Sequence, residues 1–133
     1  MNMDSKFIPY GLQWIDKDDI NEVTKVLRSN HLTSGPYTEK FEQAFANYVD
    51  VKYAIVCSSG TAALHLASLS IELNNTTAVI VPSISFLATA NAPHYTGAEI
   101  IFSDVDPFSG LITPETFLEA IKRAKKKIKS CLC

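Results

Sequence analysis

The sequence predicts an α/β protein built on a mostly parallel sheet with helices on both faces. Two observations support this class. After two helical segments, short apolar runs alternate with further helical segments along the chain. These runs lack the polar–apolar alternation of strands with one solvated face, so the strands are expected to be buried on both faces. With 47% hydrophobic and 20% charged residues, the 133-residue composition is typical of a globular protein.

Residues 1–52 are expected to form an N-terminal arm and two helices. The first 15 residues lack helical spacing and are predicted to be extended. A helix capped by Asp16 or Asp18 is predicted to run to about Ser29. Its apolar residues recur at helical spacing and would face a core: Ile20, Val23, Val26 and Leu27. After a loop over 31–36, a second helix is predicted over 37–49.

Residues 53–133 are expected to form the first part of a larger α/β domain. Buried strands are predicted for three apolar runs: residues 53–57, 78–81 and 99–102. Helices are predicted for three other segments: residues 62–73, 87–95 and 114–127. In the last, Thr113 suits the N-cap and Pro114 the first turn. A further strand should follow, but residues 128–133 depart from a hydrophobic strand, so an open sheet edge is expected.

Charge and cysteine usage argue against several classes of protein. A net charge of −2 predicts no nucleic-acid partner, and we interpret the basic cluster over 122–129 as a solvated helix end rather than an anion site. Three cysteines, two of them at the C-terminus, make neither a disulfide framework nor a metal site. No apolar run of about 20 residues and no N-terminal leader are seen, which predicts no membrane partner and a cytoplasmic location.

The segment from Cys57 to Ala63 carries the first candidate site. A predicted strand turns at Ser58–Thr61 and begins a helix. The N–H groups at this helix start, with the hydroxyls of Ser59 and Thr61, could hold a phosphate, and Gly60 would let the backbone approach it. An ordinary N-cap with a glycine turn explains the same residues. The segment matches neither the Walker A loop nor the G-x-G-x-x-G dinucleotide motif.

Phe86 carries the second candidate site. It follows the predicted strand over 78–81, and ligands of open α/β sheets lie outside the carboxyl ends of strands. Its ring would then face the same crevice as the Ser58–Thr61 turn and could stack on a planar cofactor. The alternative is that Phe86 belongs to the core, as most phenylalanines do.

Several short motifs occur in one order across nearly the whole chain. They are Ile8–Gly11, Leu32–Pro36, Phe41–Glu42, Ser58–Ala67, Val81–Ser83 with Phe86–Asn91, and Asp104–Pro107. With these motifs the chain resembles the DegT/DnrJ/EryC1/StrS sugar aminotransferases, which have the fold-type-I architecture of pyridoxal 5'-phosphate (PLP) enzymes. The resemblance implies an incomplete three-layer fold of that type. A departure lies at residues 74–77, where Asn-Asn-Thr-Thr replaces a glycine-rich turn.

The resemblance also implies roles for individual residues. Gly60 and Thr61, helped by Ser59, would bind the PLP phosphate, and Phe86 would stack on the pyridine ring. Three residues would lie near the substrate: Thr33, Ser34 and Gly35. Family members are homodimers that transfer an amino group, usually from glutamate, to 4-keto nucleotide sugars. Residues 8–11 and Gln13 are most similar to the branch that aminates UDP-4-keto-6-deoxy-N-acetylaltrosamine on the way to pseudaminic acid.

The family's two central catalytic groups match no residue of this sequence. These are the lysine that holds PLP covalently and the aspartate that pairs with the ring nitrogen, and both are expected beyond residue 133. No catalytic residue is therefore assigned, and the chain alone is expected to be inactive. The alternative hypothesis is non-catalytic: a gene remnant, or a fragment that pairs with a complementary chain.

Overall fold

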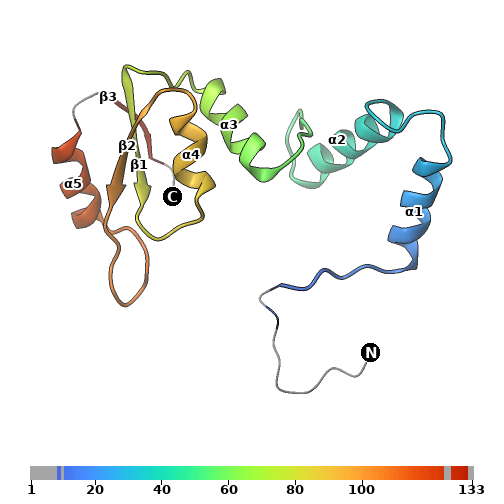
Figure 1. Ribbon diagram of the computed structural model, residues 1–133, viewed down its shortest axis with the longest axis horizontal. Helices are drawn as coiled ribbons and strands as arrows, with labels where there is room; N and C mark the ends of the chain where they lie inside the picture. Colours follow the sequence, from blue (N-terminus) through green and yellow to red (C-terminus); the bar gives the residue numbers. More distant parts are fainter. Residues whose placement is uncertain (1–8, 10, 125–126, 132–133) are drawn as a thin grey trace. The chain divides into compact units, whose positions relative to one another are not determined.

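The computed structural model describes residue 9, residues 11–124 and the backbone of residues 127–131. The chain divides into two compact units, residues 1–55 and 56–133, and each is described by itself (Figure 1). Among the described residues, no helix combines the length and the apolar character that crossing a membrane requires.

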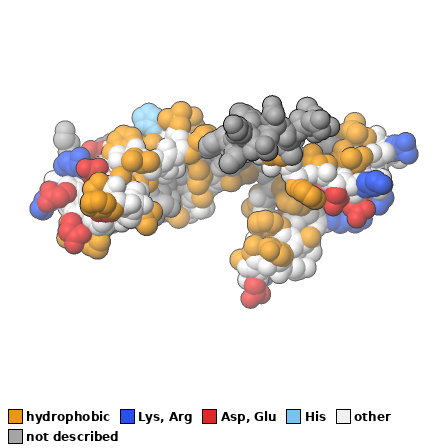
Figure 2. All heavy atoms as spheres, turned by 90° about the horizontal axis from the view of Figure 1, so that it is seen from below, with side chains coloured by type: hydrophobic (Ala, Val, Ile, Leu, Met, Phe, Trp, Pro, Cys, Tyr) orange, Lys and Arg blue, Asp and Glu red, His pale blue; other side chains and the backbone are white. Residues whose placement is uncertain are grey.

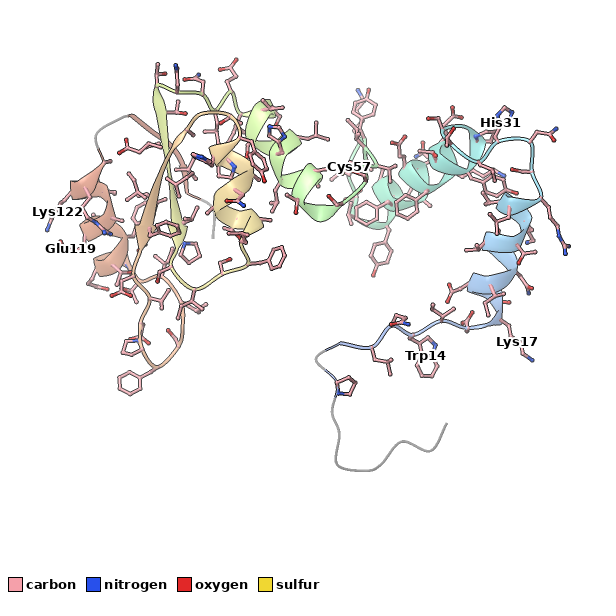
Figure 3. All side chains as sticks on the ribbon, viewed as in Figure 1. Trp14, Lys17, His31, Cys57, Glu119 and Lys122 are labelled. Carbon is pink, nitrogen blue, oxygen red and sulfur yellow. The ribbon has the colours of Figure 1, made fainter. Side chains whose placement is uncertain are left out.

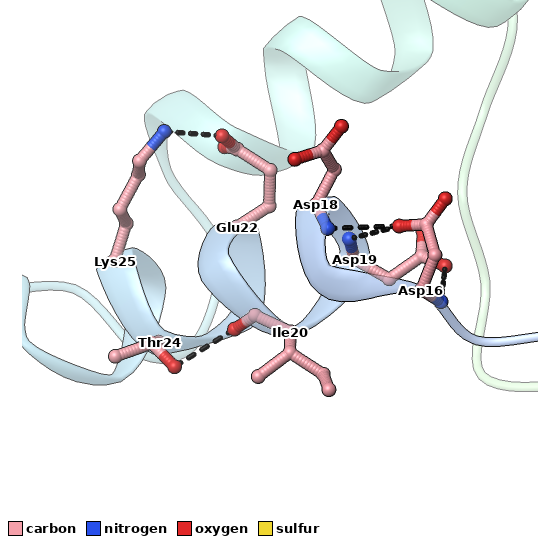
Figure 4. A network of polar contacts seen from close by, with 7 residues as sticks. All are labelled: Asp16, Asp18, Asp19, Ile20, Glu22, Thr24 and Lys25. Carbon is pink, nitrogen blue, oxygen red and sulfur yellow. Dashed lines mark hydrogen bonds and ion pairs between the residues drawn. The ribbon is translucent and has the colours of Figure 1, made fainter.

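The first unit contains helices α1 (Lys17–Leu27) and α2 (Pro36–Tyr48). A capping box begins α1 at Asp16, one of the two predicted caps. The Asp16 carboxylate accepts hydrogen bonds from the N–H groups of Asp18 at 2.8 Å and Asp19 at 3.1 Å. The Asp19 carboxylate accepts from the Asp16 N–H at 3.0 Å (Figure 4). This reciprocal pairing satisfies backbone donors that the helix itself leaves without acceptors.

The apolar face predicted for α1 is present, but within the first unit it does not face a core. Ile20, Val23 and Leu27 are 57%, 59% and 65% exposed. Among the described residues of this unit, only Ala46 is buried. Two short helices enclose too little volume to cover their own apolar side chains. Figure 2 shows hydrophobic side chains at the surface over much of the face in view.

The second unit is built on a parallel sheet of three strands in the order β2-β1-β3. The strands are β1 (Thr77–Pro82), β2 (Glu99–Ser103) and β3 (Lys127–Cys131). The helices of this unit are α3 (Gly60–Ser70), α4 (Ala88–His94) and α5 (Pro114–Arg123). Helices α4 and α5 pack on opposite faces of the sheet, and α3 packs against α4 (Figure 1).

Strand β1 lies at the centre of the core, and its alternate side chains enter two clusters. On the face covered by α4, the buried residues are Leu73, Val79, Val81 and Ala98. On the face covered by α5, they are Ala78, Ile80, Ile101 and Ala120. Burial on both faces explains why β1 is a continuous apolar run without alternation, as the sequence analysis predicted.

The prediction of a strand over residues 53–57 is wrong. This segment forms no ladder with a described strand, and Tyr53 and Ile55 are 74% and 81% exposed. The apolar run satisfies the sequence pattern of a strand, but a strand also needs a neighbour. The described strands pair only with one another, in the order β2-β1-β3.

The predicted end of the last helix is wrong, and the polar segment after it forms the strand whose hydrophobic pattern it lacks. Helix α5 ends at Arg123, not near residue 127, and Ala124 after it is extended. Residues 127–131 form β3, which pairs with β1 in a parallel ladder. A ladder is made by backbone groups, so the polar sequence of this segment does not prevent it.

Replacing Ile80 by alanine is expected to destabilise the second unit by about 2–5 kcal/mol, because Ile80 is fully buried and its removal leaves a cavity. Chemical denaturation followed by circular dichroism measures this loss. Ile84→Ala is the matched control, because Ile84 is 70% exposed and should change the free energy of unfolding by less than about 0.5 kcal/mol. Equal losses would contradict the central position of β1.

Candidate functional site

The first turn of α3 leaves two backbone donors open. Ser59 has an extended backbone and is the N-cap, and its hydroxyl oxygen accepts a hydrogen bond from the Ala62 N–H at 3.2 Å. The Ser59 carbonyl accepts from the Ala63 N–H at 3.0 Å. Helix geometry provides no intrahelical acceptor for the remaining N–H groups of this turn, those of Gly60 and Thr61. These two donors, at the positive end of the helix dipole, can bind an anion.

The space above Gly60 is open. A Cβ atom placed on Gly60 would meet no heavy atom within 4 Å. A ligand can therefore approach the backbone of this turn closely. Because Ser59 uses its oxygen as an acceptor, its hydroxyl hydrogen is left to donate. The turn thus has the donors and the clearance that a phosphate group needs.

Cys57 lies just before this turn. Its thiol is free and contacts the Ser59 carbonyl at 3.4 Å (Figure 3). Within residues 11–124 and the other described part of the chain, no group of three metal-ligating side chains lies together. The groups that this turn offers to a ligand are the N–H donors of Gly60 and Thr61.

Phe86 lies in the turn between β1 and α4 and is 78% exposed, so it is not a core residue. The turn is tied to the sheet by the Ser83 N–H, which donates to the Ser103 carbonyl at 2.9 Å. It is tied to α4 by the Thr89 N–H, which donates to the Phe86 carbonyl at 3.0 Å. An exposed aromatic ring at the carboxyl end of a central strand is placed to contact a ligand.

The two candidate segments belong to neighbouring elements of the second unit: the Ser59–Thr61 turn begins α3, and the Phe86 turn precedes α4. Helices α3 and α4 pack against each other, and α4 runs against the direction of β1 (Figure 1). The His65 ring of α3 meets the Tyr95 ring at the C-terminal end of α4 edge to face, with centroids 5.6 Å apart. That the Ser59–Thr61 turn and Phe86 face one crevice stays a prediction.

A cavity of about 390 Å³ opens beside the Phe86 turn at the same end of the sheet. Its lining comes from the loops after β1 and β2: Pro82, Ile84, Ser85, Gly110, Leu111 and Ile112. Sequence reasoning missed this cavity, because it forms only where two loops about 25 residues apart come together.

The acidic turn Asp104–Pro107 has a structural role in the loop after β2. One Asp106 carboxylate oxygen accepts hydrogen bonds from the Ser109 N–H at 2.7 Å and from the Ser109 hydroxyl at 2.9 Å. The N–H of Phe108 adds a third at 3.1 Å. These donors, those of Ser109 first, hold the pKa of Asp106 below its ordinary value. The exposed Phe108 at the loop tip is fixed by this turn.

The residues predicted near the substrate lie in the first unit. Thr33, Ser34 and Gly35 form the end of the loop between α1 and α2, and Gly35 is the N-cap of α2. Ser34 and Gly35 have φ angles of 43° and 128°, a left-handed backbone that turns the chain sharply into the helix. The glycine is required by this backbone conformation, independent of any ligand.

The amino-acid sequence is similar to that of known proteins. Residues 13–130 match the DegT/DnrJ/EryC1/StrS aminotransferase family. The chain is 37% identical over 122 residues to the spore coat polysaccharide biosynthesis protein SpsC of Bacillus subtilis, a match that covers 92% of the chain and 31% of SpsC. It is 40% identical over 105 residues to the 3-oxo-glucose-6-phosphate:glutamate aminotransferase of the same organism, covering 79% of the chain and 24% of that enzyme.

The fold is also similar to solved structures of this family. The protein Spr1654 of Streptococcus pneumoniae, solved in PMP-form and PLP-form, aligns with a TM-score of 0.78 at 27% identity in its PMP-form. That alignment covers 86% of the chain and 29% of Spr1654. The chain thus spans about a third or less of the length of these relatives. Its fold is part of the PLP-enzyme architecture, and it belongs to the DegT/DnrJ/EryC1/StrS aminotransferase family.

Proposed function

We propose that this chain supplies the phosphate-binding and ring-stacking part of a PLP-dependent sugar aminotransferase. The observation that carries the proposal is the start of α3. There a serine-capped helix leaves the N–H groups of Gly60 and Thr61 without an intrahelical acceptor, and the space above Gly60 is open, in a chain of this family. The phosphate of PLP would accept from these N–H groups and from the hydroxyls of Ser59 and Thr61.

Phe86 would hold the other end of the cofactor. Its ring is exposed at the turn before α4 and would offer a face to the pyridine ring. When bound, PLP supplies an electron sink for the carbon from which a proton is removed during transamination. The residues of this chain would bind and orient it, while the covalent lysine and the ring-pairing aspartate come from outside these 133 residues.

We propose a 4-keto nucleotide sugar as substrate and glutamate as amino donor. The similarity of residues 8–11 and Gln13 to the branch that aminates UDP-4-keto-6-deoxy-N-acetylaltrosamine supports the sugar. The names of the two Bacillus subtilis relatives, one in polysaccharide biosynthesis and one using glutamate, are in line with this reaction class. Thr33, Ser34 and Gly35 would contact the sugar, in a homodimer located in the cytoplasm.

We further propose that the 133 residues do not complete the reaction unaided. None of the described lysines takes the place of the covalent lysine in the motifs that match the family. Lys122, for example, forms an exposed ion pair with Glu119 on the outer side of α5 (Figure 3). A fragment that acts with a complementary chain fits the partial coverage of the relatives.

A segment exchange is expected to show the function directly. Residues 13–130 replace the matching segment of the Bacillus subtilis 3-oxo-glucose-6-phosphate:glutamate aminotransferase, and formation of 2-oxoglutarate from glutamate is measured with keto-sugar acceptors. We expect the chimera to bind PLP and to aminate the UDP-4-keto sugar better than the sugar phosphate. A folded chimera that binds no PLP would contradict the proposed function. Amination of the sugar phosphate alone would contradict only the proposed substrate.

Replacing Gly60 by alanine is expected to weaken phosphate binding by about tenfold without destabilising the chain, because the added methyl occupies the space through which the anion approaches. The free energy of unfolding should stay constant or rise by up to about 1 kcal/mol, since alanine favours helix.

Titration of the chain with pyridoxine 5'-phosphate measures the affinity in the Gly60→Ala variant. This probe has no aldehyde, so it cannot react with surface lysines. Gly11→Ala is the matched control, because the space around Gly11 is equally open but lies outside the α3 turn. Unchanged affinity in Gly60→Ala would show that the phosphate lies elsewhere.

A further inference from the structure

Two hydroxyl groups flank Phe86 in the chain, that of Ser85 before it and that of Thr89 after it. Ser85 Oγ and Thr89 Oγ1 are 2.8 Å apart and form a hydrogen bond. The Thr89 N–H also donates to the Phe86 carbonyl at 3.0 Å. Thr89 therefore holds this turn at two points, at Phe86 through its backbone and just before Phe86 through its side chain.

The hydroxyl pair ties the turn to α4, a helix whose N-cap makes no side-chain hydrogen bond. Leu87 is the N-cap of α4, and its side chain makes no capping hydrogen bond. By contrast, α1, α3 and α5 begin with capping side chains from Asp16, Ser59 and Thr113. Among the described residues, the Ser85–Thr89 hydrogen bond is the side-chain interaction that joins the Phe86 turn to the first turn of α4.

The Phe86 ring has little packing of its own to hold it. With the side chain 78% exposed within the described part of the chain, few neighbours restrict the ring. Its direction therefore depends on the backbone of the turn, and that backbone is held by the two hydrogen bonds of Thr89 and by the Ser83 N–H. A ring that samples several directions loses conformational entropy when it stacks on a ligand, and this loss weakens binding.

We propose that Ser85 and Thr89 are positioning residues, which hold the Phe86 ring in the direction needed to stack on the pyridine ring of PLP. The inference rests on the proposed cofactor site and adds two residues to it. Neither hydroxyl needs to touch the cofactor. Their effect passes through Phe86, so it should disappear when the aromatic ring is removed.

Titration of the 133-residue chain with pyridoxine 5'-phosphate tests this inference. Ser85→Ala and Thr89→Ala are each expected to weaken binding by about three- to tenfold, the effect of one hydrogen bond. The double variant should bind about as weakly as either single variant, because both lose the same interaction. Ser85→Thr keeps a hydroxyl and should restore most of the affinity. Ser83→Ala is the control, since Ser83 ties the turn through its backbone N–H.

Two further measurements separate positioning from general stability. In the Phe86→Leu variant, adding Ser85→Ala should cause no further loss of pyridoxine 5'-phosphate affinity. Binding of inorganic phosphate at the α3 turn should be the same with and without Ser85→Ala. In the ligand-free chain, Ser85→Ala should speed hydrogen exchange of the Thr89 amide by about three- to tenfold.

The outcomes distinguish this inference from the proposed function. Binding that is lost in Gly60→Ala and Phe86→Leu but unchanged in Ser85→Ala would overturn the inference and leave the cofactor site standing. A loss from Ser85→Ala that persists in the Phe86→Leu variant would show a role independent of the ring and would overturn it too. If the unsubstituted chain bound neither pyridoxine 5'-phosphate nor phosphate, the cofactor site and the inference would both fail.

Discussion

The complete enclosure of β1 is the constraint on which the rest of the second unit depends. Its residues are buried on both faces by α4 and α5, and its two edges are paired with β2 and β3. A strand in this position is apolar wherever its side chains enter the core, as over 78–81, and each neighbouring element must lie where it covers one side of the strand. The turns that leave β1 and β2 therefore emerge from a fixed frame at the carboxyl end of the sheet.

The Phe86 part of the candidate site is a consequence of that frame, whereas the start of α3 follows residues 53–57, which form no described strand. Parallel strands with returning helices bring helix starts to the carboxyl end, where unpaired N–H groups collect. At the start of α3, Ser59 satisfies one of these donors and leaves those of Gly60 and Thr61 for an anion. At the start of α4 the N-cap makes no side-chain bond, and the Ser85–Thr89 pair stabilises the turn instead. The two helix starts are thus built differently, in keeping with the different ligand groups proposed for them.

The first unit depends on helix capping more than on a core. Asp16 fixes the start of α1, and the left-handed backbone at Ser34 and Gly35 fixes the start of α2. Its apolar side chains remain exposed within the unit, because two helices bury too little surface to cover them. The chain covers 31% of SpsC and 24% of the glutamate-dependent relative, in which the matching helices belong to a much larger protein.

The sequence by itself determined the elements whose signals are local. The cap at Asp16, the Thr113–Pro114 helix start and the apolar runs of β1 and β2 were all predictable, because capping and burial leave their mark within a few residues. The motifs around Gly60 and Phe86 likewise identified the family from sequence alone. Only the tertiary structure decided what depends on a distant partner. Residues 53–57 have the composition of a strand but no neighbour, whereas polar residues 127–131 form β3 because the free edge of β1 accepts their backbone. The same dependence explains the cavity beside Ser85 and the hydroxyl pair with Thr89. Both require the folded turns, which no spacing in the sequence encodes directly.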